Sequence, residues 1–175
     1  MYPGKIKQRV MLSTLTVLLM LSCCLLGCGS SSPALNVAPE IGALAPDFTL
    51  PTLDKQVVSL NELRGQPLVL NFWATWCGPC RMEMPYIEAA FNQKGDGVRF
   101  IAINLGDKEG KARQFVQYMG MSFTVALDLD LAVGNAYNVR YIPTTIFIDK
   151  EGVIRHIKVG PFSSEDELMA LLEGL

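Results

Sequence analysis

One stretch, residues 67–85, constrains the fold more than any other, because an apolar run passes there into a segment that carries two cysteines. Residues 67–72 are almost all apolar, which predicts a strand covered on both faces of a sheet. Gly78 and Pro79 then end the extended run, and proline is tolerated in the first turn of a helix. The sequence therefore predicts a buried strand followed by a helix that starts near Cys77.

The two cysteines place reactive groups at the start of that helix. A sulfur at a helix N-terminus lies near the positive end of the helix dipole and near unpaired backbone N–H groups, and both favour the thiolate and lower the thiol pKa. We therefore expect Cys77 to be an exposed nucleophile. Cys80 follows one helical turn later and is expected to point inward, where it can attack a mixed disulfide formed on Cys77 and release the product.

The same pair has two other interpretations. Structural zinc sites usually have four cysteine or histidine ligands, but the other cysteines all lie within the first 28 residues and His156 is the single histidine. A purely structural disulfide is disfavoured because so small a loop removes little chain entropy from the unfolded state. Redox chemistry without a metal or a cofactor is therefore the favoured function of the pair.

Residues 73–80, Trp-Ala-Thr-Trp-Cys-Gly-Pro-Cys, resemble the active site of proteins with a thioredoxin fold. Three further segments make the chain similar to the membrane-tethered, extracytoplasmic thiol-disulfide oxidoreductases of the TlpA and ResA type: 45–50 (Ala-Pro-Asp-Phe-Thr-Leu), 60–65 (Leu-Asn-Glu-Leu-Arg-Gly) and 141–145 (Tyr-Ile-Pro-Thr-Thr). The resemblance covers residues 40–175. It implies an α/β protein with a thioredoxin-like fold, in which helices flank a central mixed sheet and an N-terminal β-hairpin is added.

The hydrophobic pattern predicts the remaining elements of such a fold. Apolar strands that alternate with helical segments at this spacing indicate parallel βαβ connections. Asn61 is expected to cap a short turn at 62–64, and Ser163 or Ser164 is expected to cap the last helix. We expect strands at 48–50, 57–60, 67–72, 98–105, 125–127, 144–148 and 153–159, and helices at 77–92, 108–118, 131–137 and after the capping serine.

One position departs from cytoplasmic thioredoxin, whose buried aspartate beneath the disulfide is replaced here by Asn71. An amide neither accepts nor donates a proton in the working pH range. Glu83 lies three residues after Cys80 and matches an acidic residue of the ResA-type pattern, so we expect it to take over this role. Partial burial would raise the pKa of Glu83 and let it mediate proton transfer to Cys80. The alternative is an exposed helical glutamate without a catalytic role.

The resemblance also implies which residues contact a protein substrate. The Ile142–Pro143 bond is expected to be cis and to face the disulfide, which leaves the backbone of Ile142 free to hydrogen-bond an extended partner segment. Trp76 is expected to offer the partner an apolar platform, whereas Trp73 is expected in the core.

The first 28 residues carry signals for export. Basic residues at positions 5, 7 and 9 precede the uncharged run 10–26, which is typical of a signal sequence or a short membrane span. Residues 25–28, Leu-Leu-Gly-Cys, resemble a bacterial lipobox, in which Cys28 is lipidated, and the Gly-Ser-Ser-Ser-Pro run that follows reads as a flexible tether. An uncleaved anchor helix is the alternative. We expect a signal peptide at 1–27, a lipidated N-terminus and tether at 28–40, and a thioredoxin-like domain at 41–175.

Charge and location narrow the classes of partner. Without residues 1–27 the chain has 12 basic and 17 acidic residues, a net charge of −5, and no basic run that would indicate nucleic acid. Either mode of anchoring places the domain outside the cytoplasm, on a membrane of the bacterial cell envelope. A dithiol there can be held oxidised or supplied with electrons, so location alone does not fix the direction. The Gly-Pro between the cysteines equals that of thioredoxin and favours a reductant.

The predicted function is the reduction of disulfides in extracytoplasmic proteins. By resemblance, the protein substrates are oxidised apocytochrome c or the cysteines of a copper site, and a membrane thiol carrier is the electron donor. One alternative is a peroxiredoxin-like peroxidase, whose Pro-x-x-x-Thr-x-x-Cys pattern would need proline and threonine where this chain has Leu70 and Ala74. Another is a Cu(I)-binding module that uses the cysteine pair. We interpret Met82 and Met84 as packing or partner contacts and His156 as a structural or surface residue.

Overall fold

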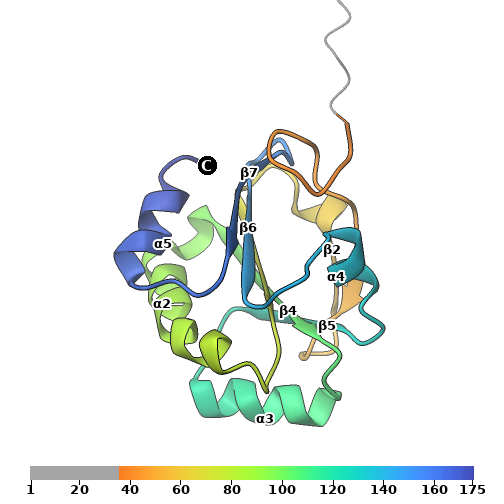
Figure 1. Ribbon diagram of the computed structural model, residues 1–175, viewed down its shortest axis with the longest axis vertical. Helices are drawn as coiled ribbons and strands as arrows, with labels where there is room; N and C mark the ends of the chain where they lie inside the picture. Colours follow the sequence, from red (N-terminus) through yellow and green to blue (C-terminus); the bar gives the residue numbers. More distant parts are fainter. Residues whose placement is uncertain (1–35) are drawn as a thin grey trace, which may run out of the picture. The chain divides into compact units, whose positions relative to one another are not determined.

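The central strand predicted before Cys77 is β3, Leu68–Trp73, and it lies in the middle of a five-stranded sheet (Figure 1). The other strands are β4, Arg99–Leu105; β5, Thr124–Asp128; β6, Thr144–Ile148; and β7, Ile154–Val159. Their order is β5-β4-β3-β6-β7. β4 runs parallel to β3 and β5, whereas β6 is antiparallel to β3 and β7, so the predicted mixed sheet is confirmed.

Residues 36–175 are the part of the chain that this computed structural model describes. The predicted signal peptide, the predicted lipidation site Cys28 and most of the predicted tether lie outside these residues. Within residues 36–175, no helix combines the length and the apolar character needed to cross a membrane.

Both faces of β3 are covered, and all six of its residues are buried. The helices are α2, Gly78–Lys94; α3, Glu109–Met119; α4, Ala132–Ala136; and α5, Glu165–Leu172. On one face Val69 and Trp73 pack in a cluster with side chains of α2, α3 and α5. On the other face Leu70 and Phe72 pack with Val133 of α4 and with the N-terminal hairpin. In Figure 1, α2 and α5 lie together on the left and α4 lies on the right.

The predicted N-terminal hairpin is present. Strand β1, Thr49–Pro51, pairs antiparallel with β2, Val57–Ser59, and a short 3₁₀ helix, Leu60–Leu63, follows. The expectation that Asn61 caps this turn is wrong. The turn starts at the buried Leu60, two residues earlier than expected, and the N–H groups of Asn61 donate to Asp47 instead.

The last helix begins where the sequence predicts. Ser164 is the N-cap of α5, and its Oγ accepts a hydrogen bond from the backbone N of Glu167 at 3.2 Å. The neighbouring Ser163 donates to the Glu167 carboxylate at 2.7 Å, so both predicted serines contact the first turn. The cap satisfies one of the N–H groups that a helix N-terminus leaves without an intrahelical partner.

Replacing Ser164 with alanine removes this cap. We expect Ser164→Ala to lower the free energy of unfolding by about 1 kcal/mol, measured by denaturant unfolding of the oxidised protein. Ser164→Asn should retain most of the stability, because asparagine is also a good N-cap. Equal losses in both variants would contradict the capping role.

Candidate active site

The two cysteines form a disulfide at the start of α2. Cys77 is the N-cap of the helix, and its Sγ accepts a hydrogen bond from the backbone N of Cys80 at 3.1 Å. Cys80 is fully buried, as predicted. The expectation that Cys77 is exposed is wrong for the disulfide form, because only 4 % of Cys77 is accessible. Cys77 packs in the same cluster as Trp73 and Ala74, and this packing covers it.

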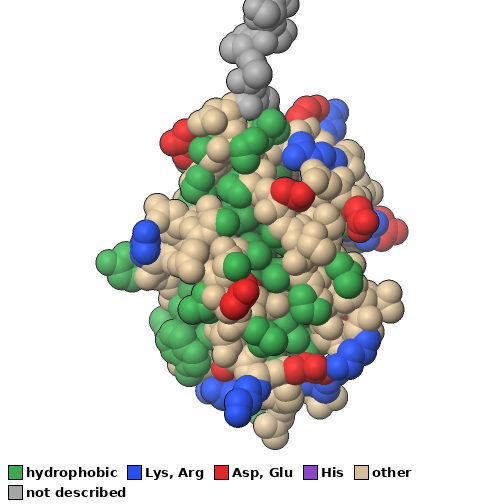
Figure 2. All heavy atoms as spheres, turned by 90° about the vertical axis from the view of Figure 1, so that its right-hand side faces the viewer, with side chains coloured by type: hydrophobic (Ala, Val, Ile, Leu, Met, Phe, Trp, Pro, Cys, Tyr) green, Lys and Arg blue, Asp and Glu red, His purple; other side chains and the backbone are tan. Residues whose placement is uncertain are grey.

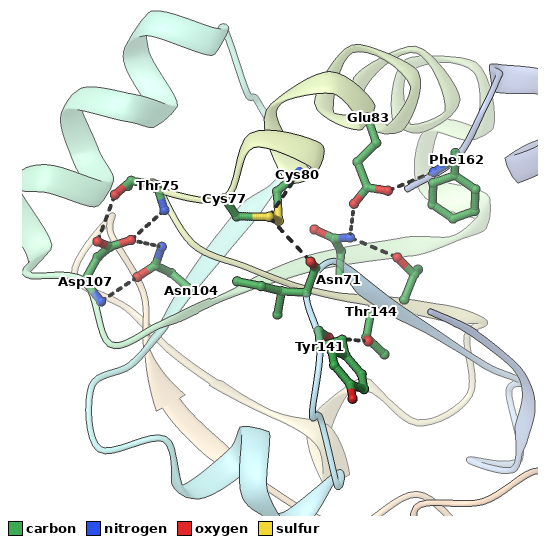
Figure 3. Close-up of a disulfide and its surroundings, with 12 residues drawn as sticks. Asn71, Thr75, Cys77, Cys80, Glu83, Asn104, Asp107, Tyr141, Thr144 and Phe162 are labelled. Atoms are coloured by element: carbon green, nitrogen blue, oxygen red, sulfur yellow. Dashed lines mark hydrogen bonds between the residues drawn. A yellow bond between two sulfur atoms is a disulfide. The ribbon is translucent and has the colours of Figure 1, made fainter. Parts of the chain in front are cut away.

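The second element of the site is the loop before β6. The predicted cis bond between Ile142 and Pro143 is confirmed, and the carbonyl oxygen of Ile142 lies 3.7 Å from the Sγ of Cys77. Thr144 Oγ1 donates a hydrogen bond to the carbonyl oxygen of Tyr141 at 2.7 Å and so closes the loop around the proline. The loop therefore faces the disulfide directly (Figure 3).

Glu83 lies beside the disulfide and is fully buried, so the alternative of an exposed helical glutamate is wrong. One carboxylate oxygen accepts a hydrogen bond from Asn71 Nδ2 at 2.8 Å, and the other accepts one from the backbone N of Phe162 at 3.1 Å. Burial raises the pKa of Glu83 to about 7, although the hydrogen bonds from Asn71 and Phe162 act in the opposite direction. The side chain therefore exchanges a proton near neutral pH.

Asn71 connects Glu83 to the sheet. Its Nδ2 group also donates to Thr145 Oγ1 at 2.9 Å, and Thr145 is its direct partner across the β3–β6 ladder. Figure 3 shows the Asn71 amide beside the disulfide, with its nitrogen turned to Glu83. Its carbonyl oxygen is buried and has no hydrogen-bond partner within residues 36–175. Asn71 thus positions the carboxyl group but cannot titrate.

A second buried carboxylate lies on the other side of the disulfide, and sequence reasoning missed it. Asp107 accepts hydrogen bonds from the backbone N of Thr75 at 2.7 Å, from Thr75 Oγ1 at 2.8 Å and from Asn104 Nδ2 at 3.0 Å. Burial alone would raise the pKa of Asp107, but these bonds and one from Lys111 outweigh it and lower the pKa. The sequence did carry a signal for it: Asn104 and Asp107 are polar residues at or just after the end of the apolar strand β4, and such strand ends in a parallel sheet often carry functional side chains.

The aromatic residues near the disulfide separate into core and surface. Trp73 is fully buried, as predicted. The centroids of its ring and the Phe115 ring are 4.8 Å apart. Trp76 is 68 % exposed and Tyr141 is 75 % exposed. Figure 2 shows that hydrophobic side chains also reach the surface on the face that carries α4. Apolar exposure alone therefore does not identify a binding surface, and the position of Trp76 next to Cys77 is what singles it out.

The remaining candidates lie on α2 and on β7. Met84 is buried, whereas Met82 is exposed on α2. His156 lies on β7 with its ring edge-on to Phe147 at 6.1 Å. Among the residues that the structure describes, no three His, Cys, Asp or Glu side chains are grouped as metal ligands would be.

The sequence and the fold were compared with protein families, curated relatives and solved structures, and all three comparisons match proteins of thiol-disulfide exchange. The Redoxin family model matches residues 40–172. The thiol-disulfide oxidoreductase ResA of Geobacillus kaustophilus is 35% identical over 163 residues, which cover 93% of this chain and 94% of the relative. A DsbE-type thiol:disulfide interchange protein from Chlorobium tepidum superposes with a TM-score of 0.73 at 33% identity, over 77% of this chain and 96% of the other. A secreted disulfide oxidoreductase of Mycobacterium tuberculosis superposes with a TM-score of 0.67 at 28% identity, over 73% and 96%.

The raised pKa of Glu83 makes stability depend on pH. The folded protein holds the proton up to about pH 7, whereas the unfolded chain releases it near 4.5, so the folded state loses stability as pH rises between these values. We expect the free energy of unfolding to fall by roughly 3 kcal/mol from this group between pH 4.5 and pH 8, and Glu83→Gln to lack this fall.

Denaturant unfolding of the oxidised protein across this pH range measures the effect. The exposed Glu62→Gln on the 3₁₀ helix is the matched control and should follow the wild type. A Glu83→Gln variant with the same pH slope as the wild type would contradict the assignment of the buried, proton-exchanging group to Glu83.

Proposed function

The chain belongs to the Redoxin family and is a thiol-disulfide oxidoreductase, and we propose that it reduces disulfides in proteins outside the cytoplasm. The observation that carries the proposal is the disulfide at the start of α2 with the buried Glu83 beside it. Dithiol–disulfide exchange requires a reactive sulfur, a second sulfur close by and a group that moves protons near neutral pH. These three requirements map onto Cys77, Cys80 and Glu83.

The reaction runs through a mixed disulfide. In the reduced protein the Cys77 thiolate attacks one sulfur of the substrate disulfide, and the other substrate sulfur leaves as a thiolate. Cys80 then attacks the Cys77 sulfur, which breaks the mixed disulfide, releases the second substrate thiol and forms the Cys77–Cys80 bond. Two electrons pass to the substrate.

The surroundings of the sulfurs support this division of roles. The backbone N–H of Cys80 points at the Cys77 sulfur at 3.1 Å, and the helix dipole adds to it, so a thiolate on Cys77 is stabilised. Cys80 is buried and must lose its proton to attack. Glu83, with a pKa of about 7, is suited to accept that proton.

Substrate recognition is proposed at the surface around the disulfide. The β3–β6 ladder begins at Thr144, so the backbone of Ile142 lies outside it and faces the sulfur of Cys77. An extended substrate segment would hydrogen-bond there, with Pro143 shaping the loop. The exposed Trp76, next to Cys77 in the chain, would contact the same segment.

Location and partners are proposed from the N-terminal sequence. We infer a signal peptide at 1–27, a lipidated Cys28 with a tether at 28–40, and the redox domain at 41–175, anchored to a membrane of the bacterial cell envelope. The secreted relative of known structure is consistent with this location. Oxidised apocytochrome c and copper-site cysteines are the proposed protein substrates, and a membrane thiol carrier is the proposed electron donor.

Insulin reduction tests the reaction. With dithiothreitol as the electron source, the wild type should accelerate insulin reduction and Cys77→Ser should be inactive, because the attacking sulfur is lost. Cys80→Ser should accumulate a mixed disulfide on Cys77, seen as an adduct by mass spectrometry. The variant lacking both sulfurs is the control and should form no adduct. An adduct on the Cys77→Ser variant instead would reverse the assigned roles.

Fractionation of cells tests the anchor. The wild type should sediment with membranes and incorporate labelled fatty acid, whereas Cys28→Ala should lose the label because the acceptor thiol is absent. A protein that carries no label and keeps residues 1–27 would support the uncleaved anchor helix and contradict the lipoprotein.

A further inference from the structure

The segment between β3 and α2 is a tight turn that carries Trp76. The backbone N of Cys77 donates to the carbonyl oxygen of Ala74 at 3.1 Å, which leaves Thr75 and Trp76 as the two central residues. Thr75 and Cys77 are buried, but Trp76 at the corner is exposed. The conformation of this turn therefore decides where the indole points, whereas α2 itself holds the Cys77 sulfur through the Cys80 backbone N–H.

Asp107, in the loop after β4, holds the turn. Its carboxylate binds both donors of Thr75, the backbone N at 2.7 Å and Oγ1 at 2.8 Å (Figure 3). Charge-assisted bonds of this kind are stronger than neutral ones. Only 5 % of Asp107 is exposed, so water competes little for these bonds.

Asp107 is itself fixed to the sheet. Asn104 Nδ2 donates to its carboxylate at 3.0 Å, and the backbone N of Asp107 donates to Asn104 Oδ1 at 3.2 Å. Asn104 is the direct partner of Trp73 in the parallel β3–β4 ladder, so the ends of the two strands lie side by side. Lys111 of α3 closes the outer side, with its Nζ 3.1 Å from the carboxylate.

We propose that Asp107 is a positioning residue, which holds the Ala74–Cys77 turn so that Trp76 is presented to a protein substrate beside the Cys77 sulfur. The inference rests on the proposed function, in which Trp76 contacts the substrate. Asp107 does not touch the reacting sulfurs. It acts through Thr75, and its effect is expected on substrates large enough to reach the indole.

Asp107→Asn tests this role with little change in shape. Four donors, from Thr75, Asn104 and Lys111, meet the two carboxylate oxygens. An asparagine offers one uncharged oxygen and an NH₂ group that cannot accept, so the charge assistance and the ion pair with Lys111 are lost, and the Thr75 hydroxyl must change from donor to acceptor or lose its bond.

Asp149→Asn is the matched control. Asp149 is also 5 % exposed, accepts from the backbone N of Val153 at 2.8 Å and pairs with Arg155 at 2.6 Å. It follows Ile148, which pairs with Leu68 at the start of β3, whereas the disulfide follows the end of β3. The control removes a buried, hydrogen-bonded charge at the opposite end of the sheet.

The rates with insulin and with hydroxyethyl disulfide, together with amide hydrogen exchange in the turn, test whether Asp107 is a positioning residue. For Asp107→Asn we expect kcat/KM for insulin to fall about tenfold, while the rate with hydroxyethyl disulfide stays within about twofold, because the small disulfide does not reach Trp76. In a Trp76→Ala background the same change should have little further effect on insulin, since coupled residues are not additive. Amide hydrogen exchange at Thr75 and Cys77 should speed up at least about tenfold, as expected when these N–H groups lose protection. Asp149→Asn should match the wild type in all three.

Several outcomes would overturn the proposal. Parallel losses with insulin and hydroxyethyl disulfide would place the effect on the sulfur chemistry, and an undiminished insulin loss in the Trp76→Ala background would separate Asp107 from the indole. Unchanged exchange at Thr75 would show that the turn does not depend on Asp107. If Asp107→Asn does not fold, Thr75→Val removes the hydroxyl bond alone and should give a smaller loss in the same pattern. A wild type inactive on insulin would contradict the proposed function instead, and amide exchange would still test the positioning.

Discussion

Burial of β3 on both faces is the constraint on which the rest of the structure depends. Successive side chains of β3 point to opposite faces of the sheet, and each face packs in its own apolar cluster. Asn71 falls on the face that α2 covers and brings a polar amide into the core. A buried amide needs partners, and Glu83 of α2 and Thr145 of β6 supply them. The placement of the carboxyl group next to the disulfide thus follows from the strand that precedes it.

The two buried carboxyl groups of the site differ in charge because they differ in donors. Glu83 receives two hydrogen bonds in a fully buried position, and desolvation dominates, so its pKa rises to about 7. Asp107 receives donors from Thr75, Asn104 and Lys111, and its pKa falls. Glu83 therefore exchanges protons near neutral pH, whereas Asp107 stays a fixed anion. One group is suited to chemistry and the other to holding the backbone.

Local patterns in the sequence predicted the elements of the sheet and the position of the disulfide. The apolar run of β3, the Gly-Pro between the cysteines and the serine before α5 each act through short-range preferences that a sequence displays. The cis bond at Pro143 came from the family resemblance. The contact of the Ile142 carbonyl oxygen with Cys77, the bond from the Phe162 N–H to Glu83 and the link from Asp107 to Thr75 join segments that are distant in sequence, and no local pattern encodes them. The error at Asn61 arose because the turn begins at the buried Leu60, two residues before its expected start at position 62.

The replacement of thioredoxin's buried aspartate by Asn71 is explained by the contact between Asn71 and Glu83. Their polar atoms lie 2.8 Å apart with the amide as donor. A carboxylate at position 71 would place two like charges at that distance, and both could not be ionised, so one pKa would rise far above neutral. An amide instead donates to Glu83 and to Thr145 and adds no charge. With the acid on α2 instead of the strand, position 71 therefore requires a neutral hydrogen-bond donor. Asn71 and Glu83 depend on each other in this way, and together they leave a single titrating group beside Cys80.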